Sequence, residues 1–164
     1  MKAKKTYVIF DGDQDHWGFG FLKGWRNNHR IDFDFDDAHS LFTLTERAKD
    51  EAYIKAKLRG RFVYTSEVIV IIGESTRFLY KYVRWELEVA LSLGLPIIAV
   101  NLNNRRSLDW NLCPPIIRET GAVHISFKLA IIRYALQDFT ATPRPLRSGS
   151  DYYYPERVYR SLGL

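Results

Sequence analysis

The stretch EVIVIIG at residues 67–73 is followed by a short polar segment, by YVRWEL at residues 82–87 and by PIIAV at residues 96–100. A strand, a helix and a second parallel strand in this order form a right-handed βαβ unit. Both apolar runs lack polar residues in their interiors, which is typical of strands that are buried on both faces. The stretch therefore predicts a parallel sheet with helices on both sides.

Strand signals also occur on either side of this unit. Further strands are expected at residues 6–10, 31–35 and 122–126. Apolar and acidic residues alternate in 31–35, as in a strand at the edge of a sheet. We therefore predict an α/β doubly wound, flavodoxin-like fold with five parallel strands in the order 2-1-3-4-5. Ligands of such folds bind at the carboxyl ends of the strands.

Helix signals separate the expected strands. Trp17, Phe21 and Trp25 recur at four-residue spacing and form an aromatic stripe on the first helix. Another helix is expected to open at Thr45-Glu46, where the threonine is a suitable cap. Its apolar face consists of Ile54, Leu58 and Phe62. A short helix is expected from Cys113 to about Glu119, and a final one at residues 129–136.

The length of 164 residues suits one domain with a full core. We assign residues 1–138 to the α/β domain and residues 139–164 to a linker and a Tyr-rich C-terminal tail. The linker is marked by Pro and Gly residues, and the tail contains Tyr152-Tyr-Tyr154. Tyrosines at this density are expected to dock on the domain or on a partner.

Charge and cysteine content favour a cytoplasmic protein that binds neither nucleic acid nor membranes. The net charge is +5, but 24 basic and 19 acidic residues are interleaved, so no basic patch is evident for nucleic acid. Cys113 is the single cysteine, which suits a reducing compartment. No segment approaches the roughly 20 apolar residues that span a membrane.

Metal and phosphate motifs fail on spacing. The run Asp11 to Asp15 imitates an EF-hand loop, but His16 stands where glycine is required and Leu22 where the bidentate glutamate belongs. The four histidines are scattered and Cys113 has no partner thiol, which disfavours zinc. No P-loop lysine motif occurs. We expect no metal and no permanently bound cofactor.

Glu86 is the side chain with the clearest chemical interest. At about 100° per residue, it lies on the rim of the apolar helix face that contains Leu79 and Val83. Trp85 and Glu88 are expected on the opposite, solvated side. A buried carboxylate is costly, so Glu86 needs either a structural ion pair, for which Lys81 or Arg84 is near in sequence, or a functional role.

The motif at residues 82–87, after a strand and the loop Gly73-Glu-Ser-Thr76, resembles the third-helix motif of TIR domains. The resemblance is strongest to TIR-like proteins of bacterial and archaeal signalling and of Thoeris-type antiphage defence. It covers nearly all of residues 5–138. The further segments that carry it are Tyr7 to Asp13, Asp32 to Ala38, Pro96 to Leu102 and Cys113 to Pro115.

This resemblance implies that Glu86 cleaves the nicotinamide–ribose bond of NAD, which is the substrate. A carboxylate in a solvent-reachable, partly desolvated hollow can stabilise the oxocarbenium-like ribose. Many TIR enzymes have Trp four residues before this glutamate, where the present chain has Tyr82. The resemblance also implies that the loop 36–42 covers the pocket; the alternative is an ordinary surface loop. The residues expected to contact the substrate are Phe10, Asp11, Asp13, Trp17, Asp36, Phe42, Ser75 and Tyr82, although Trp17 also suits the core.

Two functions remain open from the sequence. The first is a signalling enzyme that releases nicotinamide, forms an ADP-ribose-derived product for a downstream effector, and acts as a homo-oligomer in antiphage defence. The second is a non-catalytic interaction module that uses an exposed Trp85 and the tail tyrosines. A phosphate-accepting receiver domain is a weaker third reading: Asp11, Asp13 and Lys128 fit it, but the third strand ends in Gly73-Glu74 instead of the required aspartate.

Overall fold

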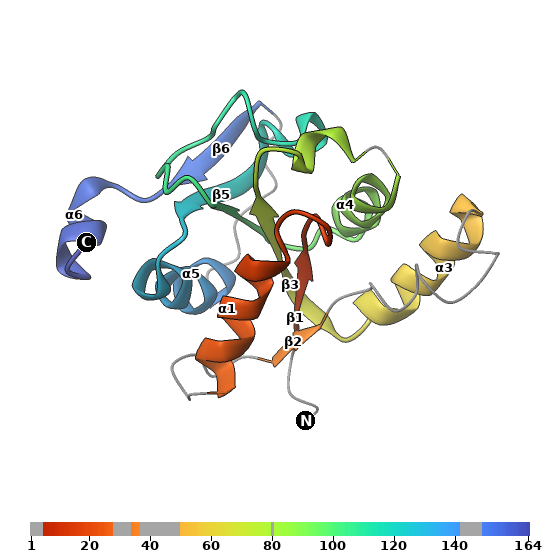
Figure 1. Ribbon diagram of the computed structural model, residues 1–164, viewed down its shortest axis with the longest axis horizontal. Coiled ribbons are helices and arrows are strands. Elements are labelled where there is room, and N and C mark those ends of the chain that lie inside the picture. Colours follow the sequence, from red (N-terminus) through yellow and green to blue (C-terminus); the bar gives the residue numbers. More distant parts are fainter. Residues whose placement is uncertain (1–4, 28–33, 37–49, 80, 142–148) are drawn as a thin grey trace.

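The strands form one parallel sheet in the order β2-β1-β3-β4-β5-β6 (Figure 1). The computed structural model describes residues 5–27, 34–36, 50–79, 81–141 and 149–164. The predicted order of the first five strands is confirmed, and β6 extends the sheet beyond β5. The strands are β1 (Lys5–Ile9), β2 (Asp34–Asp36), β3 (Thr65–Ile72), β4 (Ile97–Asn101), β5 (Thr120–Ser126) and β6 (Ser150–Tyr153).

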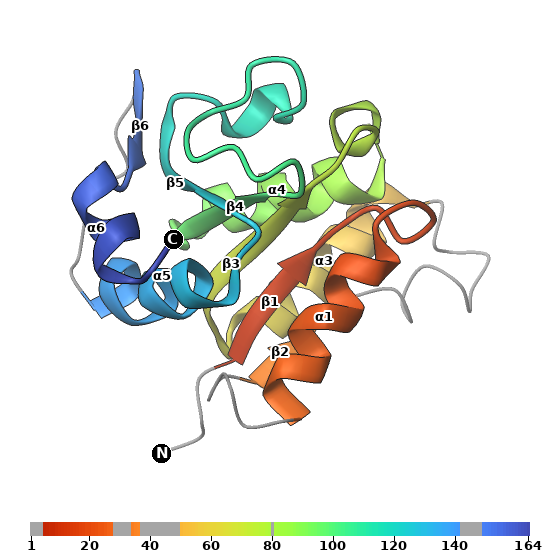
Figure 2. The same ribbon diagram turned by 60° about the vertical axis from the view of Figure 1, so that its left-hand side comes forward.

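Helices cover both faces of the sheet (Figure 2). One face packs against α3 (Glu51–Phe62), α4 (Tyr82–Ser92) and the short helix η3 (Pro115–Ile117). The other packs against α1 (His16–Asn27), α5 (Leu129–Ala141) and α6 (Glu156–Ser161). A second short helix, η2 (Thr76–Phe78), follows β3. Within the described residues, no helix is long and apolar enough to cross a membrane.

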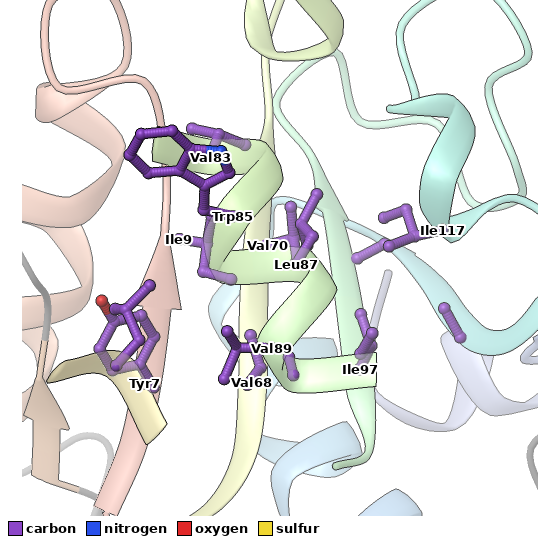
Figure 3. Packing of buried hydrophobic residues seen from close by; sticks show 14 of the residues in the cluster. Tyr7, Ile9, Val68, Val70, Val83, Trp85, Leu87, Val89, Ile97 and Ile117 are labelled. Carbon is purple, nitrogen blue, oxygen red and sulfur yellow. The ribbon is translucent and has the colours of Figure 1, made fainter. Parts of the chain in front are cut away.

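The position of β3 in the middle of the sheet explains why its sequence is an unbroken apolar run. Val68, Val70 and Ile72 point into the core beneath α4, as Figure 3 shows for the first two. Ile69 and Ile71 point into the core beneath α1 and α5. All five side chains are fully buried, so each of these five positions contributes to one of the two cores.

The aromatic stripe on α1 is not its buried face. Trp17 remains 49% exposed, so the alternative that it belongs to the core is wrong. The helix instead buries Gly18, Phe19 and Leu22. A Cβ at Gly18 would lie 3.3 Å from Leu102, so the glycine lets the helix approach the sheet closely.

The predicted exposure of Trp85 is also wrong, because α3 packs beside α4. Trp85 is only 8% exposed and belongs to the core between these helices and the sheet. Lys55 of α3 binds Glu88 of α4 across the same contact. The predicted face of Ile54, Leu58 and Phe62 is confirmed as buried. The expected start at Thr45 lies outside the described residues, and Asp50 caps α3 by accepting a hydrogen bond from the Tyr53 N–H.

The tail contributes a strand and a helix to the domain. β6 pairs with β5 in parallel, and Tyr152 lies opposite Val123 in the register. Asp151 accepts backbone N–H donors from four consecutive residues, 119 to 122, at 2.8 to 3.2 Å. His124 Nε2 lies 3.1 Å from the same carboxylate. A single acidic side chain therefore joins the tail to the start of β5.

The pKa of Asp151 reports this role. Burial alone would raise it, but the interaction with His124 and the N–H donors outweigh burial and hold the pKa below its ordinary value of 3.8. Because the pKa is lowered on folding, the stabilisation is present above pH 3.8 and is lost as the pH falls through the lower, folded-state value.

We predict that Asp151→Asn lowers the free energy of unfolding at pH 7 by about 3 kcal/mol, since it removes a buried charge partner and leaves N–H groups poorly satisfied. Chemical denaturation from pH 7 to pH 2 should show the difference from wild type shrinking below pH 3.8. The matched control is Glu156→Gln, an exposed tail acid paired with Arg106, which should cost about 1 kcal/mol or less. A difference that does not change with pH would contradict this role of Asp151.

Candidate active site

Glu86 is turned toward the sheet, as the helical pattern predicts. It lies on α4 and is only 3% exposed. The Tyr7 hydroxyl of β1 donates a 2.6 Å hydrogen bond to Glu86 Oε2. Tyr7 lies below α4, in the same core as Val89 of that helix (Figure 3). The carboxylate is therefore enclosed and receives a donor from the central part of the sheet. The expectation that it lies in a solvent-reachable hollow is wrong for the described residues, because packing of α4 on the sheet leaves it almost no exposed surface.

The two cations considered as ion-pair partners have partners of their own. Arg84 Nε donates to Glu88 Oε1 at 2.8 Å, one helical turn along α4. The Lys81 ammonium lies 4.9 Å from the ring centroid of Tyr82 and 5.7 Å from that of Trp85. The prediction that Glu88 is solvated is wrong, because it lies half-buried between Arg84 and Lys55. The hydrogen bond from Lys55 holds the pKa of Glu88 below its ordinary value, against the opposing effect of burial and with a further contribution from the Arg84 hydrogen bond.

A second polar cluster joins the loops after β1 and β3. Asp11 is buried and accepts N–H bonds from Asp13 at 2.9 Å and Gln14 at 3.2 Å, which closes the turn after β1. The Ser75 hydroxyl donates to the other Asp11 oxygen at 2.5 Å. The two positions predicted at the strand ends are therefore in direct contact across the sheet.

Asp15 is the member of this cluster that the sequence analysis missed. Its carboxylate is buried and accepts the Thr76 hydroxyl at 3.3 Å, and the same hydroxyl accepts the Gly73 N–H at 2.8 Å. Burial, followed by the nearby Asp11 charge, raises the pKa of Asp15. The sequence signal that could have identified Asp15 is its spacing of four residues from Asp11. One turn of chain over this spacing brings the second side chain back to the end of the strand.

The chain has a clear relationship to a known family. A family model described as the TIR-like domain of Thoeris protein ThsB matches residues 7–107, which is more than half of the sequence. The chain belongs to this TIR-like family. No curated protein matches it. The matched part of the TIR-like domain contains Tyr7, Asp11, Ser75 and Glu86, and it ends before the tail.

The TIR-like fold separates some of the predicted site residues. Phe10 points to the face opposite α4 and stacks on Phe19, with ring centroids 4.7 Å apart. Trp17 lies on α1 and packs edge-on against Phe127 at 5.6 Å. Asp13 is exposed on the turn after β1.

Of the other predicted positions, Tyr82 lies on α4, Asp36 lies on β2 and Phe42 is not among the described residues. Tyr82 begins α4, and its ring meets Trp85 at 5.5 Å. The backbone of Asp36 lies opposite Tyr7 in the register of β1 and β2. Phe42 lies outside the described residues.

Metal-assisted catalysis and attack by a cysteine thiol have no support among the described residues. No cluster of three or more His, Cys, Asp or Glu side chains in this part of the chain is arranged to hold a metal ion. Burial raises the pKa of Cys113 to about 12, so its thiol stays protonated and is a poor nucleophile.

We predict that Gly73→Ala destabilises the protein by about 1 to 3 kcal/mol, because the new methyl group would overlap Asp15. A Cβ at Gly73 would lie only 2.3 Å from Asp15 Oδ2 and 2.4 Å from Oδ1. Thermal and chemical denaturation measure the loss.

Asp15→Ala provides the second arm of a double-mutant cycle, since it removes the atoms that the methyl group meets. Gly73→Ala should cost clearly less in that background. Gly60→Ala is the matched control, because a Cβ there meets nothing within 4 Å and helix propensity alone should make it neutral or stabilising. Equal costs of Gly73→Ala in both backgrounds would contradict the proposed contact.

Proposed function

We propose that this TIR-like protein cleaves the nicotinamide–ribose bond of NAD, with Glu86 as the catalytic carboxylate, and that it signals in antiphage defence. The observation that carries the proposal is the inward carboxylate of Glu86 on α4, hydrogen-bonded to Tyr7, in a chain that matches the ThsB TIR-like family. Family membership supports the defence role, and the chemistry of the carboxylate supports the cleavage.

The reaction needs few protein groups. When the bond between nicotinamide nitrogen and ribose C1′ breaks, its electron pair stays with nicotinamide, which leaves as a neutral ring. The positive charge moves onto the ribose, where an ionised Glu86 stabilises it and accepts hydrogen bonds from ribose hydroxyls. Attack of water on C1′ and loss of its proton would give ADP-ribose, and attack by a group of the same nucleotide would give a cyclic product.

The remaining substrate contacts are proposed at the carboxyl edge of the sheet, where ligands of doubly wound folds bind. Asp11 and Ser75 form one wall there, because their hydrogen bond joins the loops after β1 and β3. Asp13 and Tyr82 are proposed to contact the substrate from the β1 loop and from the start of α4. Phe10 supports the β1 loop from the opposite face through its stack on Phe19.

The burial of Glu86 sets a condition on this mechanism. At 3% exposure, the carboxylate reaches substrate only in a conformation in which its surroundings open. We propose that self-association of the domain and the arrival of NAD favour that conformation. The energy for opening then comes from differential binding to the open state.

The same burial favours a second candidate function. A carboxylate that is enclosed and hydrogen-bonded to Tyr7 also suits a structural polar link between β1 and α4. The domain would then act as a non-catalytic interaction module. Because Trp85 is buried, its contacts would use other surfaces, such as the exposed Tyr153 of the tail.

We predict that Glu86→Gln reduces nicotinamide release from NAD by roughly 100-fold or more, because an amide cannot neutralise the developing ribose charge. Purified wild type and variant are incubated with NAD over a series of protein concentrations, and free nicotinamide is quantified by chromatography. The concentration series tests the need for self-association.

Glu88→Gln is the matched control, since it removes a carboxylate from the same helix and breaks its contacts with Lys55 and Arg84. It should keep activity near wild type. A Glu86→Gln variant as active as wild type would overturn the assignment. A wild type that is inactive throughout, with Glu86→Gln clearly less stable, would favour the interaction module.

A further inference from the structure

A hollow lies at the β6 edge of the sheet, away from the proposed NAD site. Its volume is about 450 Å³, and it is lined by the loop after β4 and the beginning of β6. The lining includes Arg105, Ser107, Trp110, Glu119 and Tyr153. Strands β4 and β5 separate it from the loops after β1 and β3. Its volume is within the roughly 300 to 1,000 Å³ of small-molecule sites.

The loop that forms one wall is held by buried polar side chains. Asn101 Nδ2 donates to the carbonyl oxygens of Arg105 at 3.0 Å and Ser107 at 3.1 Å. Asp109 accepts the N–H of Asn111 at 2.9 Å and the side-chain amide of Asn103 at 2.9 Å. Asn101 and Asp109 are both buried. The loop therefore has a fixed shape, although it contains no regular secondary structure.

The opposite wall is equally fixed. Asp151 holds the start of β6 through its four backbone N–H donors and His124. Tyr152 and Tyr153 follow it directly in the strand and also line the hollow. A binding site between two preformed walls loses little conformational entropy when a ligand enters.

Large aromatic side chains remain exposed at the rim of this rigid frame. Trp110 is 54% exposed and Tyr153 is 68% exposed. The guanidinium of Arg118 lies 5.7 Å from the Trp110 ring centroid, and Arg118 is itself fixed by two hydrogen bonds to the Cys113 carbonyl at 2.7 and 3.0 Å. The indole is thus oriented by a cation–π contact while much of its surface stays open.

The polar groups define what kind of ring would bind. Arg105 is exposed on its loop, where its guanidinium suits a phosphate. Glu119 lines the same hollow and suits the hydroxyl groups of a ribose. Among the described lining residues, Arg105 carries a positive charge, and Glu119 and Asp151 carry carboxylates. The Asp151 oxygens are already engaged by backbone N–H donors and His124, so Glu119 is the carboxylate open to a ligand. This charge balance favours a single phosphate group over a polyphosphate, which the carboxylates would repel.

We propose that this hollow is a second ligand site that binds a nucleoside monophosphate. The base stacks on Trp110 and Tyr153, Arg105 contacts the phosphate, and Glu119 accepts from the ribose. The site uses none of the residues assigned to NAD cleavage. Its ligand would contact both the long loop after β4 and the tail strand β6, and so would stabilise the docked tail.

We test the proposal by isothermal titration of AMP into the full-length wild-type protein, since AMP lacks the bond that NAD cleavage breaks. AMP should bind with one saturable site, and Trp110→Ala should weaken it by roughly tenfold or more through loss of base stacking. Arg105→Ala should weaken AMP binding by a similar factor. It should leave the binding of adenosine, which lacks the phosphate, unchanged. Ribose 5-phosphate, which lacks the base, should bind weakly to the parent and to the Trp110→Ala variant.

The controls are Tyr64→Ala, an exposed aromatic outside the hollow, and Arg133→Ala, an exposed arginine on α5. Both should bind AMP as the parent does. Trp110 and Arg105 are exposed, so melting temperatures of their variants should stay near that of the parent, and Tyr153→Ala provides a further stacking variant. Absence of AMP binding at millimolar concentration, or unchanged binding by both Trp110→Ala and Tyr153→Ala, would overturn the proposal. Neither result depends on whether Glu86 cleaves NAD.

Discussion

The burial of β3 on both faces is the constraint on which the rest of the structure depends. Its last five side chains, Val68 to Ile72, point alternately into two separate cores and are all fully buried. A strand of this kind is stable only if helices cover both sides of the sheet, since either open face would expose apolar surface to water. The parallel connections that this requires bring the loops after β1 and β3 together at one edge. The contact between Asp11 and Ser75 is a direct consequence.

Buried polar side chains fix the loops that this framework leaves irregular. Asp11 and Asp15 hold the loops after β1 and β3, Asp109 holds the loop after β4, and Asp151 holds the tail. Asp11, Asp109 and Asp151 each accept several donors, which offsets the cost of removing them from water. Apolar packing alone would give these loops no unique shape, because it has no directional preference. The hydrogen bonds therefore decide where the exposed groups of each loop lie.

The sequence predicted those features that depend on local periodicity. The unbroken run in β3 and the inward direction of Glu86 follow from patterns within a short stretch of chain. The strand order follows from the alternation of strands and helices along the chain. Trp85 was misplaced because a helical wheel describes one helix and does not show that α3 lies beside it. Asp15 and Asp151 were missed because their partners are 61 and about 30 residues away. The docking of β6 depends on such contacts as well, so the tail's sequence alone did not reveal a sixth strand.

The environment of Glu86 is what an electrostatic catalyst needs and also what a structural link needs. A carboxylate removed from water interacts more strongly with a developing positive charge, because the local dielectric constant is lower. The same removal from water makes the Tyr7 hydrogen bond stronger and the link between β1 and α4 more rigid. The two functions therefore differ in whether substrate can reach Glu86 and not in the chemistry of its carboxylate. Catalysis would require the residues packed around Glu86 to move aside, whereas the sheet beneath Glu86 is fixed by the two-sided core. Selection for catalysis would then act on the residues that block access to Glu86 more than on the sheet that positions it.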